Sequence, residues 1–131
     1  MVLKLEDITT YIDSIGYSSN KECIIWGTAM PTGFSYALFG AVSVLDLKYN
    51  VLQLNDSGII IIPISSTSGK IIEGEYIAIP KEEITDIKFS KGMLGYTLEV
   101  VTSKGNLKFK VRKKMLGANW HSANLENILK N

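Results

Sequence analysis

The sequence predicts an α+β fold, a small antiparallel β-barrel or sandwich of about seven strands with a short N-terminal helix and a C-terminal capping helix. Two observations support this prediction. Short runs of β-forming residues separated by turn signals fill most of the chain, and helical apolar spacing occurs near its two ends. No repeat period or low-complexity linker interrupts the 131 residues, so we expect residues 1–131 to form a single domain.

The N-terminal segment, residues 1–17, is predicted to be a helix that ends at Gly16. Its apolar residues recur at spacings of three and four and form one stripe: Leu5, Ile8, Ile12 and Ile15. The next segment, Glu22–Met30, is rich in β-forming residues and stops at Pro31. It is therefore expected to be the first strand.

Six further strands are predicted from alternating or continuous apolar runs between turns: Tyr49–Leu54, Gly58–Ile64, Ile71–Ile79, Glu83–Phe89, Gly95–Thr102 and Leu107–Arg112. Pro63 implies an edge or a bulge within its strand. The last strand alternates most regularly, so one of its faces should be core and the other solvated. An amphipathic helix over residues 118–130 follows, with these apolar positions: Trp120, Ala123, Ile128 and Leu129.

An uncharged window of twenty-three residues, Cys23–Leu45, is long enough to span a bilayer. Its glycine, proline, serine and threonine content and its flanks without positive bias instead favour a buried strand followed by an apolar, small-residue insert over residues 33–47. A spanning or re-entrant segment is the alternative. The insert is either a cap over an open barrel end or an oligomer or membrane contact, with these candidates: Phe34, Tyr36, Ala37, Leu38, Phe39 and Ala41.

The charge of the chain is unevenly distributed. The net charge of +1 argues against a nucleic-acid partner, yet residues 1–80 hold four basic and eight acidic side chains, whereas residues 81–131 hold ten basic and five acidic. Six cations are candidates for contact with an anionic lipid surface: Lys104, Lys108, Lys110, Arg112, Lys113 and Lys114. The alternative is a solvated face that blocks edge pairing or is neutralised by Glu99 across the sheet.

Catalysis has little support in the sequence. One cysteine and one histidine exclude a disulfide framework within the chain and most metal cages, and no nucleophile elbow, phosphate loop or zinc motif occurs. We therefore expect no catalytic residue, metal, cofactor or small-molecule substrate. Cys23 is expected to be a buried or half-buried thiol, and Trp26 and Trp120 are expected to be core residues.

The order of seven strands and one C-terminal helix is that of the pleckstrin-homology (PH) superfold, and several segments resemble bacterial PH-like domains of unknown function. The likeness covers roughly residues 22–129 and rests on core and turn positions rather than on a chemical motif. It includes the apolar insert before the second strand and these runs: YNVLQLNDSGIIIIPI (49–64), IAIPKEEITDI (77–87), KGMLGYTL (91–98), KFKVRKKMLG (108–117) and the closing NLENIL.

The resemblance implies a PH-like fold without fixing a ligand, because such folds bind membranes, peptides or their own copies. Phosphoinositide-binding PH domains carry Lys and Arg around the first hairpin, whereas residues 23–47 here contain none, which disfavours that ligand. We expect a non-catalytic interaction module that acts by self-association or protein contact in a bacterial cytoplasm. Peripheral binding to anionic lipid through residues 34–39 and 104–114 is the alternative.

Overall fold

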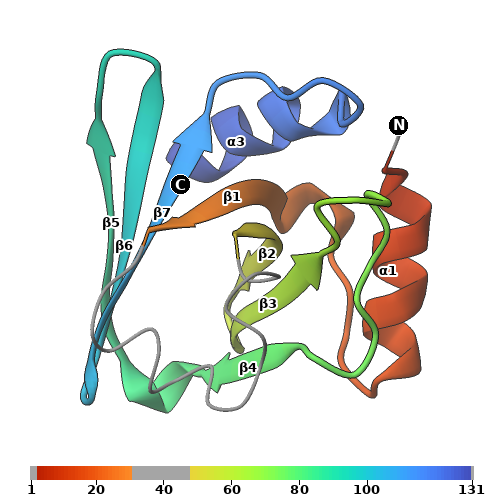
Figure 1. Ribbon diagram of the computed structural model, residues 1–131. Coiled ribbons are helices and arrows are strands. Elements are labelled where there is room, and N and C mark those ends of the chain that lie inside the picture. Colours follow the sequence, from red (N-terminus) through yellow and green to blue (C-terminus); the bar gives the residue numbers. More distant parts are fainter. Residues whose placement is uncertain (1–2, 31–47, 131) are drawn as a thin grey trace.

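The computed structural model describes residues 3–30 and 48–130. Figure 1 shows a bent sheet with one helix on each side of it. The elements are α1 (Leu5–Ser14), a 3-10 turn η1 (Lys21–Cys23), β1 (Ile24–Met30), β2 (Tyr49–Asn55), β3 (Gly58–Ile64), β4 (Ile77–Pro80), a 3-10 turn η3 (Lys81–Glu83), β5 (Ile84–Lys91), β6 (Gly95–Thr102), β7 (Gly105–Arg112) and α3 (Trp120–Lys130).

The strands of the described residues form one antiparallel sheet in the order β4-β3-β2-β1-β7-β6-β5. Strand β1 joins the two halves, because Ile24–Thr28 pairs with β2 whereas only Thr28–Met30 pairs with β7. The sheet is open, with β4 and β5 at its ends. The α+β class, the antiparallel sheet and both helices agree with the prediction.

The main core lies between the two halves of the bent sheet. Strands β1–β4 supply one wall, β6 and β7 supply the other, and α3 closes the space between them with Leu125. The buried side chains of this core are Ile25, Leu52, Ile59, Ile61, Ile79, Leu98, Val100, Leu107, Phe109, Val111 and Leu125.

A second cluster lies on the other face of β1–β3, where α1 covers the sheet (Figure 1). Its buried members are Leu3, Ile8, Tyr11, Ile12, Ile24, Val51, Ile60, Ile62 and Ile64. Successive side chains of a strand point to opposite faces, and both faces of β3 are covered, so all seven of its residues are buried. This explains why the isoleucine run is continuous rather than alternating.

Pro63 occupies a local edge within β3, as predicted. Strand β4 pairs only with Gly58–Ile61, and the Pro63 carbonyl accepts a hydrogen bond from the Ile72 N–H at 2.9 Å on that side. The N–H and C=O of one strand residue point the same way, so the missing N–H of Pro63 faces a side where the pairing with β4 has ended and only the isolated bridge between Ile64 and Ile71 follows.

The predicted strand Ile71–Ile79 is wrong over most of its length. Ile71 forms one isolated bridge to Ile64, and the regular strand begins only at Ile77. Between them the chain turns at Gly74, which has a φ of +85° and donates its N–H to the Tyr11 hydroxyl at 2.9 Å. A glycine in the left-handed region interrupts extended backbone, and the hydrogen bond ties the loop to α1.

The helix ends differ slightly from the prediction. Helix α1 ends at Ser14 and is followed by Gly16 at a φ of +93°, as expected. Helix α3 begins at Trp120, and its deeply buried residues are His121 and Leu125, whereas Ala123, expected on the apolar face, is exposed. Trp120, Ile128 and Leu129 are partly buried against the cores as predicted, so the predicted stripe is wrong only at Ala123.

Candidate functional site

The cations of β7 lie on the outer face of the sheet. Lys108, Lys110 and Arg112 are exposed, and the residues between them, Leu107, Phe109 and Val111, are buried. The predicted alternation is thus confirmed. It follows from the main core, which takes every second side chain of this strand.

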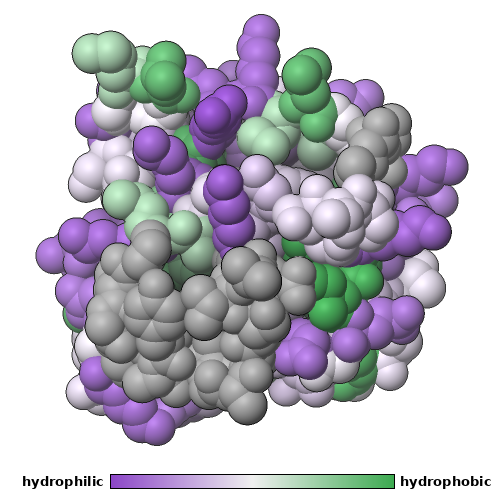
Figure 2. Space-filling view, in the orientation of Figure 1, coloured by the Kyte–Doolittle hydropathy of each residue, from purple (hydrophilic) through white to green (hydrophobic). Residues whose placement is uncertain are grey.

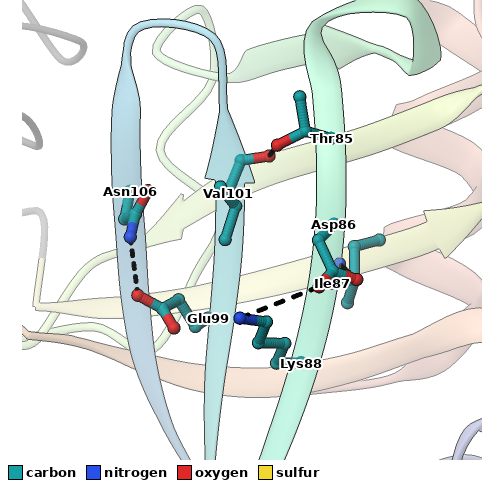
Figure 3. Close-up of polar contacts among 7 residues, drawn as sticks. All are labelled: Thr85, Asp86, Ile87, Lys88, Glu99, Val101 and Asn106. Carbon is teal, nitrogen blue, oxygen red and sulfur yellow. Dashed lines mark hydrogen bonds and ion pairs between the residues drawn. The ribbon is translucent and has the colours of Figure 1, made fainter.

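The outer face of β5–β7 carries both signs of charge near its middle (Figure 3). Glu99 pairs in register with Lys108 on one side and with Lys88 on the other, and its carboxylate accepts a hydrogen bond from Asn106 Nδ2 at 2.7 Å. Lys88 Nζ lies 3.8 Å from a carboxylate oxygen of Asp86. Lys108 therefore has a carboxylate as its cross-strand neighbour, which weakens its attraction for an external anion.

Lys104 does not join the other candidate cations. It lies in the turn between β6 and β7, at the opposite end of β7 from Arg112, and its Nζ is 4.0 Å from a Glu83 carboxylate oxygen. Eight strand residues at about 3.3 Å each separate the two ends by roughly 25 Å. The six cations that are close in sequence are thus divided in space.

The other end of β7 carries cations in segments that contain no acidic residue. Lys110 pairs in register with Thr97 and Thr28, and Arg112 pairs with Gly95. Residues 87–98 and 100–125 contain no Asp or Glu. We call residues 91–95 and 112–116 the loop end, since they form the β5–β6 hairpin and the start of the β7–α3 connection, both at the top of Figure 1. Its cations are Lys91, Arg112, Lys113 and Lys114.

The loop end also exposes large apolar side chains. Met93 is 97% exposed, Leu94 is 79% exposed and Leu116 is fully exposed at 102%. A hollow of about 200 Å³ between the hairpin and β7 is lined by residues 92–97 and 110–112. Figure 2 shows hydrophobic groups standing out at this end of the molecule with hydrophilic groups between them.

Sequence reasoning placed Met93 and Leu94 between the two predicted strands Glu83–Phe89 and Gly95–Thr102 and did not single them out. The available signal was their position between two glycines, because a tight turn of that kind cannot bury its own tip. Leu116 carried a similar signal, since it lies between a run of cations and Gly117.

Sequence reasoning assigned no role to His121, which has a structural one. It is fully buried, its Nδ1 accepts the Trp26 N–H at 2.9 Å, and its Nε2 lies 2.6 Å from the Arg112 carbonyl oxygen. A carbonyl can only accept, so Nε2 carries the proton and the imidazole is neutral. Burial lowers the pKa of His121, and the hydrogen bond to Arg112 opposes this shift only in part. Both ring nitrogens are engaged in holding the sheet together.

The remaining candidate residues have structural surroundings. Cys23 is a half-buried free thiol, as predicted, and burial, followed by the nearby carboxylates of Glu22 and Asp56, raises its pKa. Trp120 is partly buried against the α1 cluster and donates Nε1–H to the Leu3 carbonyl at 2.9 Å. Trp26 packs against Tyr49 in the same cluster.

The candidate contact residues of the apolar insert lie outside the described residues: Phe34, Tyr36, Ala37, Leu38, Phe39 and Ala41. The uncharged window is described only up to Met30, and from Ile24 to Met30 it is strand β1, preceded by Cys23 at the end of the 3-10 turn η1. Across residues 3–30 and 48–130, no helix has the length and apolar character needed to cross a membrane. The same residues contain no cluster of three or more metal-binding side chains of the His, Cys, Asp or Glu type.

Comparisons with protein families, with curated proteins and with solved structures found no match for this chain. Over residues 3–30 and 48–130 the structure defines the class as an α+β protein with a bent, open, seven-stranded antiparallel sheet and a C-terminal helix.

Proposed function

We propose that the protein is a non-catalytic, PH-like binding module that attaches to an anionic partner through the cations of the loop end and the adjoining part of β7. The observation that carries this proposal is the position of Lys91, Arg112, Lys113 and Lys114 at one end of the sheet, in segments that contain no acidic residue. Arg112 and the neighbouring Lys110 lie on the outer face, whereas the register of Lys91 with Tyr96 places it on the other face at the same end. Within the described residues, none of these five cations forms an ion pair.

Orientation matters more than net charge for this binding. A cation held near an anionic surface contributes about 1 kcal/mol, so several must face the surface together. The chain as a whole is almost neutral, at +1, and its acidic residues are concentrated in residues 1–80. A partner should therefore be attracted to one end of the molecule and turned away from the α1 side.

Charge reversal at matched positions tests this proposal. The variant Lys110→Glu/Arg112→Glu/Lys113→Glu reverses two of the four cations of the loop end, Arg112 and Lys113, and the neighbouring Lys110. The control Lys21→Glu/Lys70→Glu/Lys130→Glu changes the net charge by the same amount at exposed sites on other elements. The probes are immobilised heparin, which is a polyanion without lipid, and vesicles of phosphatidylcholine mixed with phosphatidylglycerol.

The wild type and the control should bind at least one of the two probes at low salt and be released at high salt, since exposed charges are screened. The loop-end variant should lose this binding. The proposal would be refuted if the control lost as much binding as the loop-end variant, or if the wild type bound neither probe at low salt.

Self-association or protein contact through residues 34–41, the first expectation from the sequence, stays a prediction, because those residues lie outside the described part of the chain. It makes a different demand on experiment. Association between copies of the chain should depend on protein concentration and survive high salt. Binding of an anionic partner through the loop end should instead be lost at high salt.

A further inference from the structure

We propose that the anionic partner of the loop end is a phospholipid bilayer, into which Met93, Leu94 and Leu116 insert while the cations around them contact lipid phosphates. This inference rests on the proposed function and adds to it the class of partner. Its basis is the combination, at one end of the molecule, of highly exposed apolar side chains with cations that form no ion pair within the described part of the chain and lie in segments without Asp or Glu.

The apolar side chains are concentrated rather than scattered. Among the described residues the exposed large hydrophobic side chains are Tyr17, Ile87, Met93, Leu94 and Leu116, and the three most exposed all belong to the loop end. Tyr17 and Ile87 are each only 40% exposed. Isolated surface apolar residues are ordinary, but a cluster at one protruding end marks an interaction site.

The hairpin holds its two apolar residues away from the rest of the protein. The Gly92 N–H donates to the Gly95 carbonyl at 2.7 Å, which closes a turn whose central residues are Met93 and Leu94. Gly95 packs directly against β7, where an added Cβ would strike the carbonyl oxygen of Val111. The tip is therefore fixed before binding, so insertion requires little ordering of the chain.

The cations are placed as insertion into a lipid interface requires. Lys91 directly precedes the turn, Arg112 is the register partner of Gly95, and Lys113 and Lys114 lead towards Leu116. When apolar side chains enter the boundary between head groups and acyl chains, cations set back from the tip lie at the level of the lipid phosphates and can bind them. A nucleic acid or an acidic protein would use the cations but would leave the extended apolar tip in water.

The test separates lipid insertion from charge attraction. The variant Met93→Ser/Leu94→Ser/Leu116→Ser keeps every charge of the loop end, and Ile87→Ser removes an exposed apolar residue elsewhere. Leu94→Trp enlarges the inserted surface with a residue that favours membrane interfaces. Binding is measured by co-sedimentation with the mixed phosphatidylcholine and phosphatidylglycerol vesicles and, separately, by retention on heparin. Unfolding curves confirm that each variant is folded.

We expect the triple serine variant to bind the vesicles at least 100-fold more weakly, Ile87→Ser to bind as the wild type does, and Leu94→Trp to bind several-fold more tightly. Vesicle binding by the triple variant equal to that of the wild type would overturn the bilayer proposal and leave the charge-based function standing. Wild-type binding to heparin but not to vesicles would also overturn it and point to a soluble polyanion. Binding to neither probe would refute the proposed function itself.

Discussion

Replacing His121 by alanine should lower the free energy of unfolding by about 2–5 kcal/mol, because the imidazole completes the sheet. If the β1–β7 register continued two residues beyond the Thr28–Lys110 pair, Trp26 would lie opposite Arg112. The strands have separated there, and the ring bridges them by accepting the Trp26 N–H and donating to the Arg112 carbonyl.

The magnitude follows from the two groups that the substitution would leave unpaired. Each buried backbone donor or acceptor without a partner costs about 1–3 kcal/mol, and the void left by a fully buried ring adds to this. His121→Gln is the graded variant, since its amide oxygen can accept and its amide nitrogen can donate, and it should cost less. Ser122→Ala, the next residue on α3, is the control and should stay within about 0.5 kcal/mol of the wild type.

Stability should also fall on mild acidification. The folded-state pKa of His121 is lowered by burial, so between about pH 6.5 and that lower value the unfolded chain binds more protons than the folded protein. The free energy of unfolding should therefore decrease by up to about 1.4 kcal/mol for each unit of pH lost in this window. His121 is the only histidine, so His121→Gln should remove most of this slope above pH 5.5.

Urea unfolding followed by tryptophan fluorescence at pH 7.5 and pH 5.5 measures both effects. Two results would refute the reasoning. One is a loss of less than about 1 kcal/mol in His121→Ala at pH 7.5, because two part-buried backbone groups without partners and the void left by a fully buried ring together cost more than that. The other is an undiminished pH slope in His121→Gln, which would mean that another group titrates.

Two further substitutions test the hairpin and the α1 contact. Gly95→Ala should destabilise the protein by more than about 1 kcal/mol, because the added Cβ meets the Val111 carbonyl. The added Cβ of Gly92→Ala, in the same turn, makes only an ordinary contact at 3.6 Å, so this variant should stay within about 0.5 kcal/mol of the wild type. Urea unfolding compares the two variants, and equal losses of stability would contradict the packing argument. Tyr11→Phe should cost about 1 kcal/mol by removing the acceptor of the Gly74 N–H, while Tyr17→Phe, at a more exposed ring, should cost nothing measurable in the same assay.

Most of the secondary structure could be predicted because its signals are local. The alternation in β7 and the apolar stripe of α1 are each set by the few residues that form the element. The segment 72–76 was predicted wrongly because its apolar residues resemble a strand, whereas the turn at Gly74 is held by a tyrosine 63 residues away. No local pattern contains that contact.

The candidate site was predictable only in part, for a similar reason. The cations of β7 were visible in the sequence, but their separation from Lys104 and the position of Arg112 at the same end of the sheet as Lys91 depend on how three strands are arranged. The register of β6 and β7 places the Glu99 carboxylate opposite Lys108 and places Gly95, which has no side chain, opposite Arg112. Exposure of Met93 and Leu94 likewise depends on whether any other element covers the hairpin.

The sequence by itself determined the class of fold, the order of its elements and the absence of acidic residues from the segments around the loop end, because periodicity, turn residues and charge are properties of short stretches of chain. Only the tertiary structure decided which cations lie together, which apolar side chains stay in water and what the single histidine does. These features depend on contacts between residues far apart in the chain. His121 shows this most directly, because it forms hydrogen bonds to Trp26, 95 residues away in β1, and to Arg112, 9 residues away in β7.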